Sequence, residues 1–124
     1  MTHEVTPAPG TDPWDTVDAL WEWLDGNPDY GGREGLLLRL LKIQEEVGEV
    51  ASAVIGATGQ NPRKGVTHTW DDVEAELCDV VITAMVALRS LTPAARETFA
   101  RHLARVRDRS LGAAPGAQGR PGQG

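Results

Sequence analysis

The sequence lacks the features that would place it in several large classes of protein. Its 124 residues include one cysteine, Cys78, which excludes an intramolecular disulfide and a zinc site built on several cysteines. A lone cysteine is typical of a reduced, cytoplasmic protein, and we expect Cys78 to be a small core residue. No run of about 18 apolar residues predicts a membrane span, and residues 1–10 lack the apolar stretch of a signal peptide.

Basic residues are also scarce. Lys and Arg together number 12 against 18 Asp and Glu, which gives a formal net charge of -6. A protein that binds nucleic-acid polymers or an anionic membrane surface needs a surplus of positive charge, so we expect neither as a partner. The simplest explanation of the surplus acids is a surface that keeps the protein in solution.

The two ends of the chain differ from its middle. Residues 112–124 read GAAPGAQGRPGQG, and residues 1–11 are polar and contain two prolines. Such segments bury too little apolar surface to offset the entropy lost on ordering, so we expect both to be disordered. One domain remains, over residues 12–111, and the length of the chain suits a single domain.

The first half of this domain shows helical periodicity. Asp12 followed by Pro13 predicts an N-cap and the first position of a helix, with apolar residues at helical spacing as far as Leu24. A second helix is expected over residues 33–57. Its apolar stripe is typical of the buried seam of a bundle and consists of Leu36, Leu40, Ile43, Val47, Val50 and Val54.

The second half continues in the same way. Thr69 followed by Asp72 predicts an N-cap with an acidic capping box, opening a helix that extends to Leu91. Thr92 and Pro93 predict the cap of a fourth helix, which should extend to about Ser110. No segment alternates with the period of two that indicates a strand. We therefore predict an all-α protein, a four-helix bundle.

The second and third helices carry matching pairs of acids. Glu46 and Glu49 are three residues apart, as are Glu76 and Asp79, and each acid comes one residue before a position of the apolar stripe. If the two helices pack antiparallel, Glu46 lies opposite Asp79 and Glu49 opposite Glu76. Four crowded carboxylates repel one another unless a cation compensates them. Ligands that offer only oxygen favour Mg²⁺, with Mn²⁺ as a substitute; the alternative is two exposed faces balanced by Arg.

Glu45 adds a fifth acid beside Glu46. It projects about 100° away from Glu46 around the helix. This position suits a catalytic residue that orients or deprotonates a water molecule, and it suits a solvent-exposed residue equally well.

The connection between the acidic helices contains the sequence TGQNPRKG, residues 58–65. At 1.5 Å per residue, the acids lie roughly 14 Å before the end of one helix and roughly 11 Å after the start of the next. The connection should therefore cap the end of the cleft that the acids line. Asn61, Arg63 and Lys64 are then candidates to bind the phosphates of a substrate. Without the acids, the same stretch would be an ordinary solvated loop.

These motifs resemble those of a known family. EExxE at residues 45–49, followed after 26 residues by ExxD at 76–79, resembles the signature of MazG-like proteins, and QNPRKG is similar to a loop of their small members. These proteins are all-α nucleoside triphosphate pyrophosphohydrolases. The resemblance covers residues 14–110.

The resemblance implies Mg²⁺-dependent hydrolysis of a nucleoside triphosphate, such as a dNTP or a modified nucleotide, to the monophosphate and pyrophosphate, as house-cleaning of the nucleotide pool. It implies that Glu46, Glu49, Glu76 and Asp79 are the metal ligands. It also implies a homodimer or homotetramer that completes the bundle, with an active site bordering the subunit interface.

Several alternatives stay open. A tryptophan could stack on the base, although four tryptophans in a small bundle are more often anchors of a core or an interface. The arginines of the fourth helix could contact phosphate or form a solvated face. Neither His68 nor His102 belongs to the Glu-x-x-His pairs of a di-iron bundle, which argues against an oxidase. The competing interpretation of the whole chain is a non-enzymatic helical regulator that binds a nucleotide or a protein.

Overall fold

The computed structural model describes residues 12–112 of the chain. These residues form four α-helices and one short π-helical turn, with no strand among them, which confirms the prediction of an all-α protein. The predicted disordered ends lie outside the described residues, apart from Gly112. The described residues fall into two units, 12–93 and 94–112, which are considered separately below.

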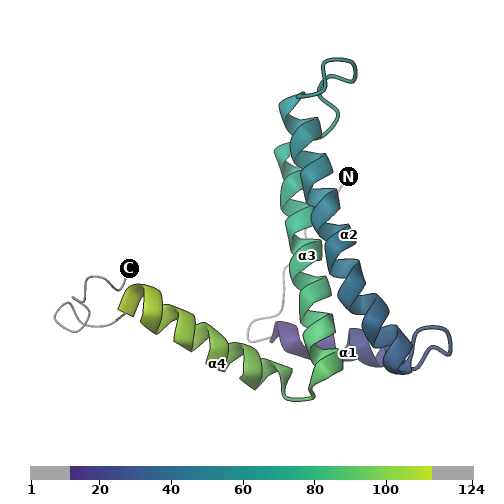
Figure 1. Ribbon diagram of the computed structural model, residues 1–124, viewed down its shortest axis with the longest axis vertical. Coiled ribbons are helices and arrows are strands. Elements are labelled where there is room, and N and C mark those ends of the chain that lie inside the picture. The colour runs from purple at the N-terminus through teal and green to yellow at the C-terminus, as the bar shows by residue number, and fades with distance from the viewer. Residues whose placement is uncertain (1–11, 113–124) are drawn as a thin grey trace. The chain divides into compact units, whose positions relative to one another are not determined.

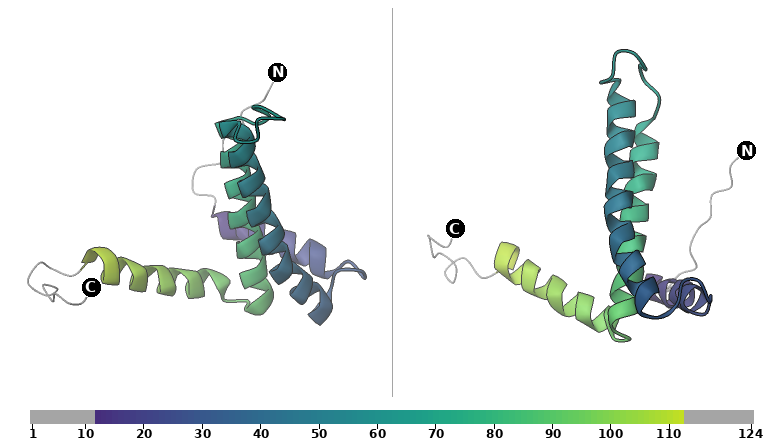
Figure 2. Two further views of the ribbon diagram at one scale, coloured as in Figure 1. Left: turned by 45° about the horizontal axis from the view of Figure 1, so that its top comes forward. Right: turned by 45° about the vertical axis from the view of Figure 1, so that its right-hand side comes forward.

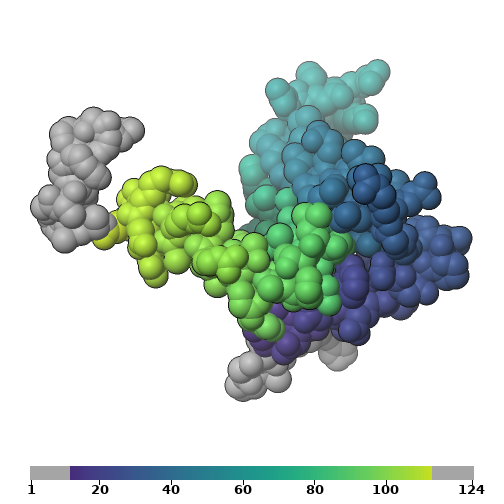
Figure 3. Space-filling view, turned by 60° about the horizontal axis from the view of Figure 1, so that its bottom comes forward, coloured from purple at the N-terminus to yellow at the C-terminus, as the bar shows by residue number. Residues whose placement is uncertain are grey.

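Helix α1 (Pro13–Asp25) begins where the sequence predicts. The side chain of Asp12 accepts a hydrogen bond of 2.8 Å from the backbone N–H of Trp14, and Pro13 occupies the first turn, where its missing N–H leaves no bond unmade. Trp14 and Val17 are the buried residues of this helix. Figure 3 shows the end of the unit that contains α1, where the atoms of α1 lie against those of α2 (Gly32–Thr58) and α3 (Trp70–Leu91).

Helices α2 and α3 are antiparallel and lie side by side along their length (Figures 1 and 2). Helix α2 ends at Gly59, whose φ of 65° is the left-handed conformation that glycine adopts without steric cost. Helix α3 opens with the predicted capping box. The hydroxyl of Thr69 accepts a bond of 3.2 Å from the N–H of Asp72, whose carboxylate accepts one of 2.9 Å from the N–H of Thr69.

The seam between α2 and α3 is less buried than its apolar stripe predicts. Ala53, Val73 and Ala87 are buried, but the side chains of Val47 and Leu77 are about half exposed. Two paired helices cover only the side that each turns toward the other, so a stripe as wide as this one remains partly in solvent. Cys78 is exposed, and the expectation that it belongs to the core is wrong.

A buried arginine secures the turn between α1 and α2. Nε of Arg39 donates to Oγ of Ser90 at 2.7 Å, and Nη1 donates to the carbonyl of Tyr30 at 3.0 Å. Nη2 lies 3.8 Å from the carboxylate of Asp25. A Cβ at Gly35 would collide with the same Tyr30 carbonyl, so only glycine lets the turn approach α2 this closely. Arg39 of α2 thereby connects the end of α1, the turn that follows it and α3.

A second arginine ties α3 to α1. Nε of Arg89 donates to the carboxylate of Asp18 at 2.9 Å, and its guanidinium lies 4.0 Å from the centre of the Trp21 ring. This geometry combines an ion pair with a cation–π contact. The α1 end of the unit thus holds its cations between anions, carbonyl groups and an aromatic face.

The second unit consists of α4 (Ala95–Arg107) and a π-helical turn, η1 (Asp108–Gly112). The prediction that Thr92 is the N-cap of this helix is wrong. Thr92 is instead the C-cap of α3, with an extended backbone, and Ala94 is the N-cap of α4. The residue before a proline is pushed out of the α region, so Pro93 ends α3. Among the described helices, none alone is long and apolar enough to cross a membrane, and only the broken pair of α3 and α4 passes that test, on length and composition alone.

Candidate metal centre

Three carboxylates converge between α2 and α3. Glu46, Glu76 and Asp79 each place one oxygen so that the three atoms lie within 4.8 Å of one another. The oxygens around an octahedral Mg²⁺ at about 2.1 Å are about 3–4 Å apart. The three side chains therefore need only a small approach to become ligands of such an ion. Because the helices are antiparallel, acids more than 25 residues apart in the sequence meet at one level.

Glu49, the fourth predicted ligand, is not in this group. Its side chain is exposed on α2, one turn after Glu46. Its charge nevertheless acts on the cluster, since it is the first of the neighbouring carboxylates that raise the pKa of Glu76. Glu49 thus belongs to the electrostatic surroundings of the group, although its oxygens are not among those that lie within 4.8 Å of one another.

The pKa of Glu76 reflects the repulsion between the carboxylates of this cluster. Its pKa is raised above the ordinary value, first by burial and then by the charges of Glu49, Asp79, Glu46 and Asp72. No cation contributes to lowering it. A bound divalent cation would favour the charged carboxylates, and its binding would release any proton they hold. The donor set, the spacing and the charge of the three residues fit Mg²⁺.

Lys42 is the cation that the sequence analysis missed. Its ammonium group lies 3.3 Å from the carboxylate of Glu45 and 3.5 Å from that of Glu46. The hydrogen bond and charge of Glu45, and then Glu46, raise the pKa of Lys42. A Lys three and four residues before two acids is a recognisable signal on a helix, which could have identified these pairs. Lys42 compensates Glu46 but reaches neither acid of α3.

Glu45 stands outside the group of three carboxylates. Its side chain is 67% exposed and paired with Lys42, whereas that of Glu46 is only 16% exposed. The angular separation expected from the helix therefore holds: adjacent acids face different surroundings. In this arrangement Glu45 would reach a water molecule of the centre only after leaving Lys42.

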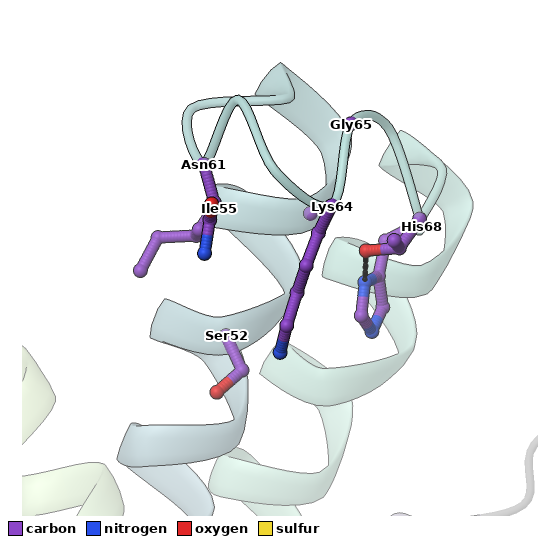
Figure 4. A pocket seen from close by; sticks show the side chains of 8 residues that line it. Ser52, Ile55, Asn61, Lys64, Gly65 and His68 are labelled. Carbon is purple, nitrogen blue, oxygen red and sulfur yellow. Dashed lines mark hydrogen bonds between the residues drawn. The ribbon is translucent and has the colours of Figure 1, made fainter.

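Two of the three candidate phosphate-binding residues line a single cavity, of about 270 Å³, where α2 ends and the connection to α3 begins (Figure 4). Asn61 and Lys64 border it, whereas Arg63 is exposed and does not. Asn61 also shapes the turn, because its side-chain oxygen accepts a bond of 3.0 Å from the N–H of Arg63. His68, directly before Thr69, the N-cap of α3, borders the same cavity.

A second cavity, of about 160 Å³, lies toward α1. Its lining is mainly apolar and consists of Leu20, Leu24, Arg39, Lys42, Ile82, Thr83 and Val86. None of the four tryptophans borders either of these two cavities. Trp14 packs in the α1 end, while Trp23 and Trp70 are 70% and 57% exposed. Stacking on a base therefore remains a prediction for which these cavities select no tryptophan.

Comparisons of the chain with protein-family models, with curated proteins and with solved structures found no match. The function must therefore be argued from the residues and their geometry. The main feature of that geometry is the convergence of three acids from two helices, with a cavity that contains a basic side chain farther along the same pair of helices.

Proposed function

We propose that this chain is a Mg²⁺-dependent nucleoside triphosphate pyrophosphohydrolase, with Mn²⁺ as a substitute metal. The observation that carries the proposal is the meeting of one oxygen each of Glu46, Glu76 and Asp79 within 4.8 Å, where no Lys or Arg of residues 12–112 forms an ion pair with Glu76 or Asp79. A structural role explains such a cluster poorly, because like charges at short range lower stability. The resemblance of its motifs to those of MazG-like proteins supplies the reaction.

The residues of the chain divide the work of this reaction. Glu46, Glu76 and Asp79 would hold the metal, and Glu49 would be its fourth protein ligand. Bound Mg²⁺ supplies neutralisation of the phosphate oxygens and a lower pKa for the attacking water. In hydrolysis, the water oxygen bonds to phosphorus, the bond between the α- and β-phosphates breaks, and a proton is released.

Two further roles belong to residues beside the cluster. Glu45 accepts the proton of the water in this proposal, and for that its carboxylate must leave Lys42, 3.3 Å away. Asn61, Arg63 and Lys64 hold phosphate oxygens from the connection between α2 and α3. The substrate is a dNTP or a modified nucleotide, and the reaction clears unwanted nucleotides from the cellular pool.

We also propose that the protein works as a homodimer or homotetramer that completes a helical bundle. Apolar side chains that are 46% exposed or more gather on α2 and α3. They are Leu37, Leu38, Leu41, Val47, Trp70, Leu77, Val81 and Leu91. A monomer rarely leaves so much apolar surface in water, and a second copy would cover it. Sedimentation analysis tests this directly, since a strictly monomeric protein at micromolar concentration would contradict it.

The activity is tested with a panel of nucleoside triphosphates. Purified full-length protein is incubated with each ribo- and deoxynucleotide and Mg²⁺, and pyrophosphate and monophosphate are quantified. Glu76→Gln removes one ligand charge, and Glu74→Gln is its matched control, since Glu74 is exposed on the same helix outside the cluster. We expect release that Glu76→Gln abolishes and Glu74→Gln leaves unchanged. Absence of release from every nucleotide by correctly folded, metal-loaded protein would refute the proposal.

The non-enzymatic regulator remains the competing interpretation. A regulator would bind nucleotide or protein through surfaces that do not require the acids. Its prediction is that nucleotide binding survives Glu46→Ala and Glu76→Ala. Loss of binding and turnover together in these variants would exclude the regulator.

A further inference from the structure

The cavity beside the α2–α3 connection lies farther along the same pair of helices than the carboxylate cluster. Ser52 on its α2 wall comes six residues after Glu46, roughly 9 Å farther along the helix axis. His68 on its other wall comes directly before Thr69, the N-cap of α3, and eight residues before Glu76. The cavity and the cluster therefore follow one another along one pair of helices.

The walls of this cavity are held by the chain itself. The N–H of Thr67 donates to the carbonyl of Gly56 at 2.9 Å, which brings the connection back onto α2. A Cβ at Gly56 would collide with the His68 ring, so glycine is required for this approach. The carbonyl of Asn61 accepts the N–H groups of Lys64 and Gly65 at 3.1 and 2.9 Å. A site with ordered walls loses little entropy when it binds a ligand.

The polar groups on the walls suit an anion. Lys64 extends from the connection along the cavity toward Ser52 (Figure 4), and its ammonium group has no carboxylate partner among residues 12–112. Nδ1 of His68 lies 3.0 Å from the hydroxyl of Thr67, which leaves Nε2 of the ring available to a ligand. No Asp or Glu lines the cavity. A cationic side chain with hydrogen-bond donors near it, and no carboxylate, is typical of a phosphate-binding site.

The cations that border the second cavity, toward α1, are already engaged. Lys42 pairs with Glu45 and Glu46, and Arg39 is bonded to Ser90 and Tyr30. The two cavities thus differ in kind, because the one beside the connection offers an unpaired ammonium group, whereas the one toward α1 is mainly apolar and both of its cations have partners.

From this difference we infer that the cavity beside the connection binds the two terminal phosphates of the triphosphate, with Lys64 and His68 as their donors. The inference rests on the proposed function, and it adds the orientation of the substrate along the helix pair and a phosphate-binding role for His68. The part of the substrate that leaves as pyrophosphate lies toward the connection, and the nucleoside lies toward α1. Lys64 and His68 are binding residues here, and neither takes part in bond breaking.

The test uses inorganic pyrophosphate and a nucleoside monophosphate as separate probes. Each is titrated calorimetrically into the full-length protein with Mg²⁺ present, for wild type, Lys64→Met and His68→Asn. Arg33→Met is the matched control, because Arg33 is an exposed cation at the opposite end of α2. We expect Lys64→Met to weaken pyrophosphate binding about 10- to 100-fold, His68→Asn to weaken it less, and both to leave the monophosphate unaffected. Lys64→Arg should restore most of the affinity.

Each outcome decides between the two proposals. The inference is overturned if pyrophosphate binds equally to wild type and Lys64→Met, or if Lys64→Met weakens the binding of both probes equally. In either case, turnover by the wild type would still support the proposed activity. If pyrophosphate binding depends on Lys64 but no triphosphate is hydrolysed, the proposed activity fails while the anion site remains. Circular dichroism of each variant confirms that the helices are intact. Gly56→Ala, which crowds the His68 ring, should weaken pyrophosphate binding in the same selective way.

Discussion

Two regions of the α2–α3 pair differ in how their charges are compensated. At the α1 end, Arg39 and Arg89 each sit within hydrogen-bond distance of complementary partners. In the middle, three carboxylates approach one another, and their neighbours raise the pKa of Glu76 instead of lowering it. The first arrangement stabilises the fold by itself. The second lowers stability unless a cation compensates it.

This contrast separates structural from functional charges. A buried cation surrounded by acceptors is explained by the fold, because removing it would leave those acceptors unsatisfied. A cluster of like charges that the fold does not compensate indicates a ligand of opposite charge.

The largest effect should follow from changing an acid of α3. We expect Asp79→Asn to reduce turnover by at least about 100-fold, since changes even in groups that only orient metal ligands cost about 10–100-fold. The helical content should be unchanged, because Asp79 is exposed and has no structural partner described for it. Steady-state kinetics with the preferred nucleotide and circular dichroism give the two readings. Activity within twofold of the wild type would show that Asp79 is not a ligand.

Arg39→Met should produce the largest loss of stability. It leaves the Tyr30 carbonyl and Ser90 hydroxyl without their donor, and we expect the free energy of unfolding to fall by about 2–4 kcal/mol. The expected loss is at the lower end of the range for a buried ion pair, because the Asp25 side chain is 38% exposed and remains hydrated when its partner is removed. Urea denaturation measures it. Arg33→Met, on the surface, should change the same quantity by less than about 0.5 kcal/mol.

Mg²⁺ should stabilise the protein through the middle region alone. At a metal concentration 100 times the dissociation constant, a ligand that binds only the folded state adds about 2.7 kcal/mol. The melting temperature should therefore rise with Mg²⁺ in the wild type and in Arg39→Met, but not in Glu76→Gln. A rise of equal size in Glu76→Gln would place the bound ion elsewhere.

Asp18→Asn should have a smaller effect at the α1 end. Its ion pair with Arg89 is short at 2.9 Å, but the Asp18 side chain is 43% exposed, so solvent screens the interaction. We expect a loss of no more than about 1 kcal/mol, because the contact of Arg89 with the Trp21 ring remains. A double-mutant cycle with Arg89→Met measures the coupling, and a value of several kcal/mol would contradict this account.

The smallest effect concerns pH in the absence of metal. The folded protein raises the pKa of Glu76 above its ordinary 4.5, so the folded state binds this proton more tightly than the unfolded chain does. The free energy of unfolding should therefore increase as the pH falls through the raised pKa, with the gain complete below 4.5. Asp72 contributes the opposite slope, but only at lower pH, because its pKa is lowered from 3.8.

The test compares the free energy of unfolding of chelator-treated wild type with that of Glu76→Gln, by chemical denaturation at a series of pH values down to 4.5. Groups common to both proteins cancel in the difference. The stability of the wild type should approach that of the variant as the pH falls. A gap that widens on acidification would reverse the sign assigned to Glu76.

Much of the fold could be predicted from the sequence because its signals are local. The caps at Asp12 and Thr69 depend on residues two or three positions away, and the structure has both. The error at Thr92 came from two competing local signals, a cap before a proline and a helix end before the same proline. The exposed stripe and Cys78 depend on what covers the helices, which periodicity alone does not specify.

The candidate centre could be predicted in outline for a similar reason. Matching spacings on two helices, with a connection that makes them antiparallel, were enough to place Glu46 near Asp79. The position of Lys42 was available from its spacing to Glu46 and was missed. The cavity at His68 could not be predicted, because it depends on how residues 59–69 return to Gly56, and helical periodicity carries no information about such a path.

The antiparallel pairing of α2 and α3 also bears on the order in which the chain folds. The three acids lie within residues 46–79, whereas Asp18 and Arg89, which hold α1 in place, are 71 residues apart. Closing the shorter segment costs less entropy, so the hairpin of α2 and α3 should form before α1 docks on α3. The acids are then brought together while little else supports them. We expect refolding to be faster with Mg²⁺ present, because the ion relieves their repulsion at the step where the hairpin first closes.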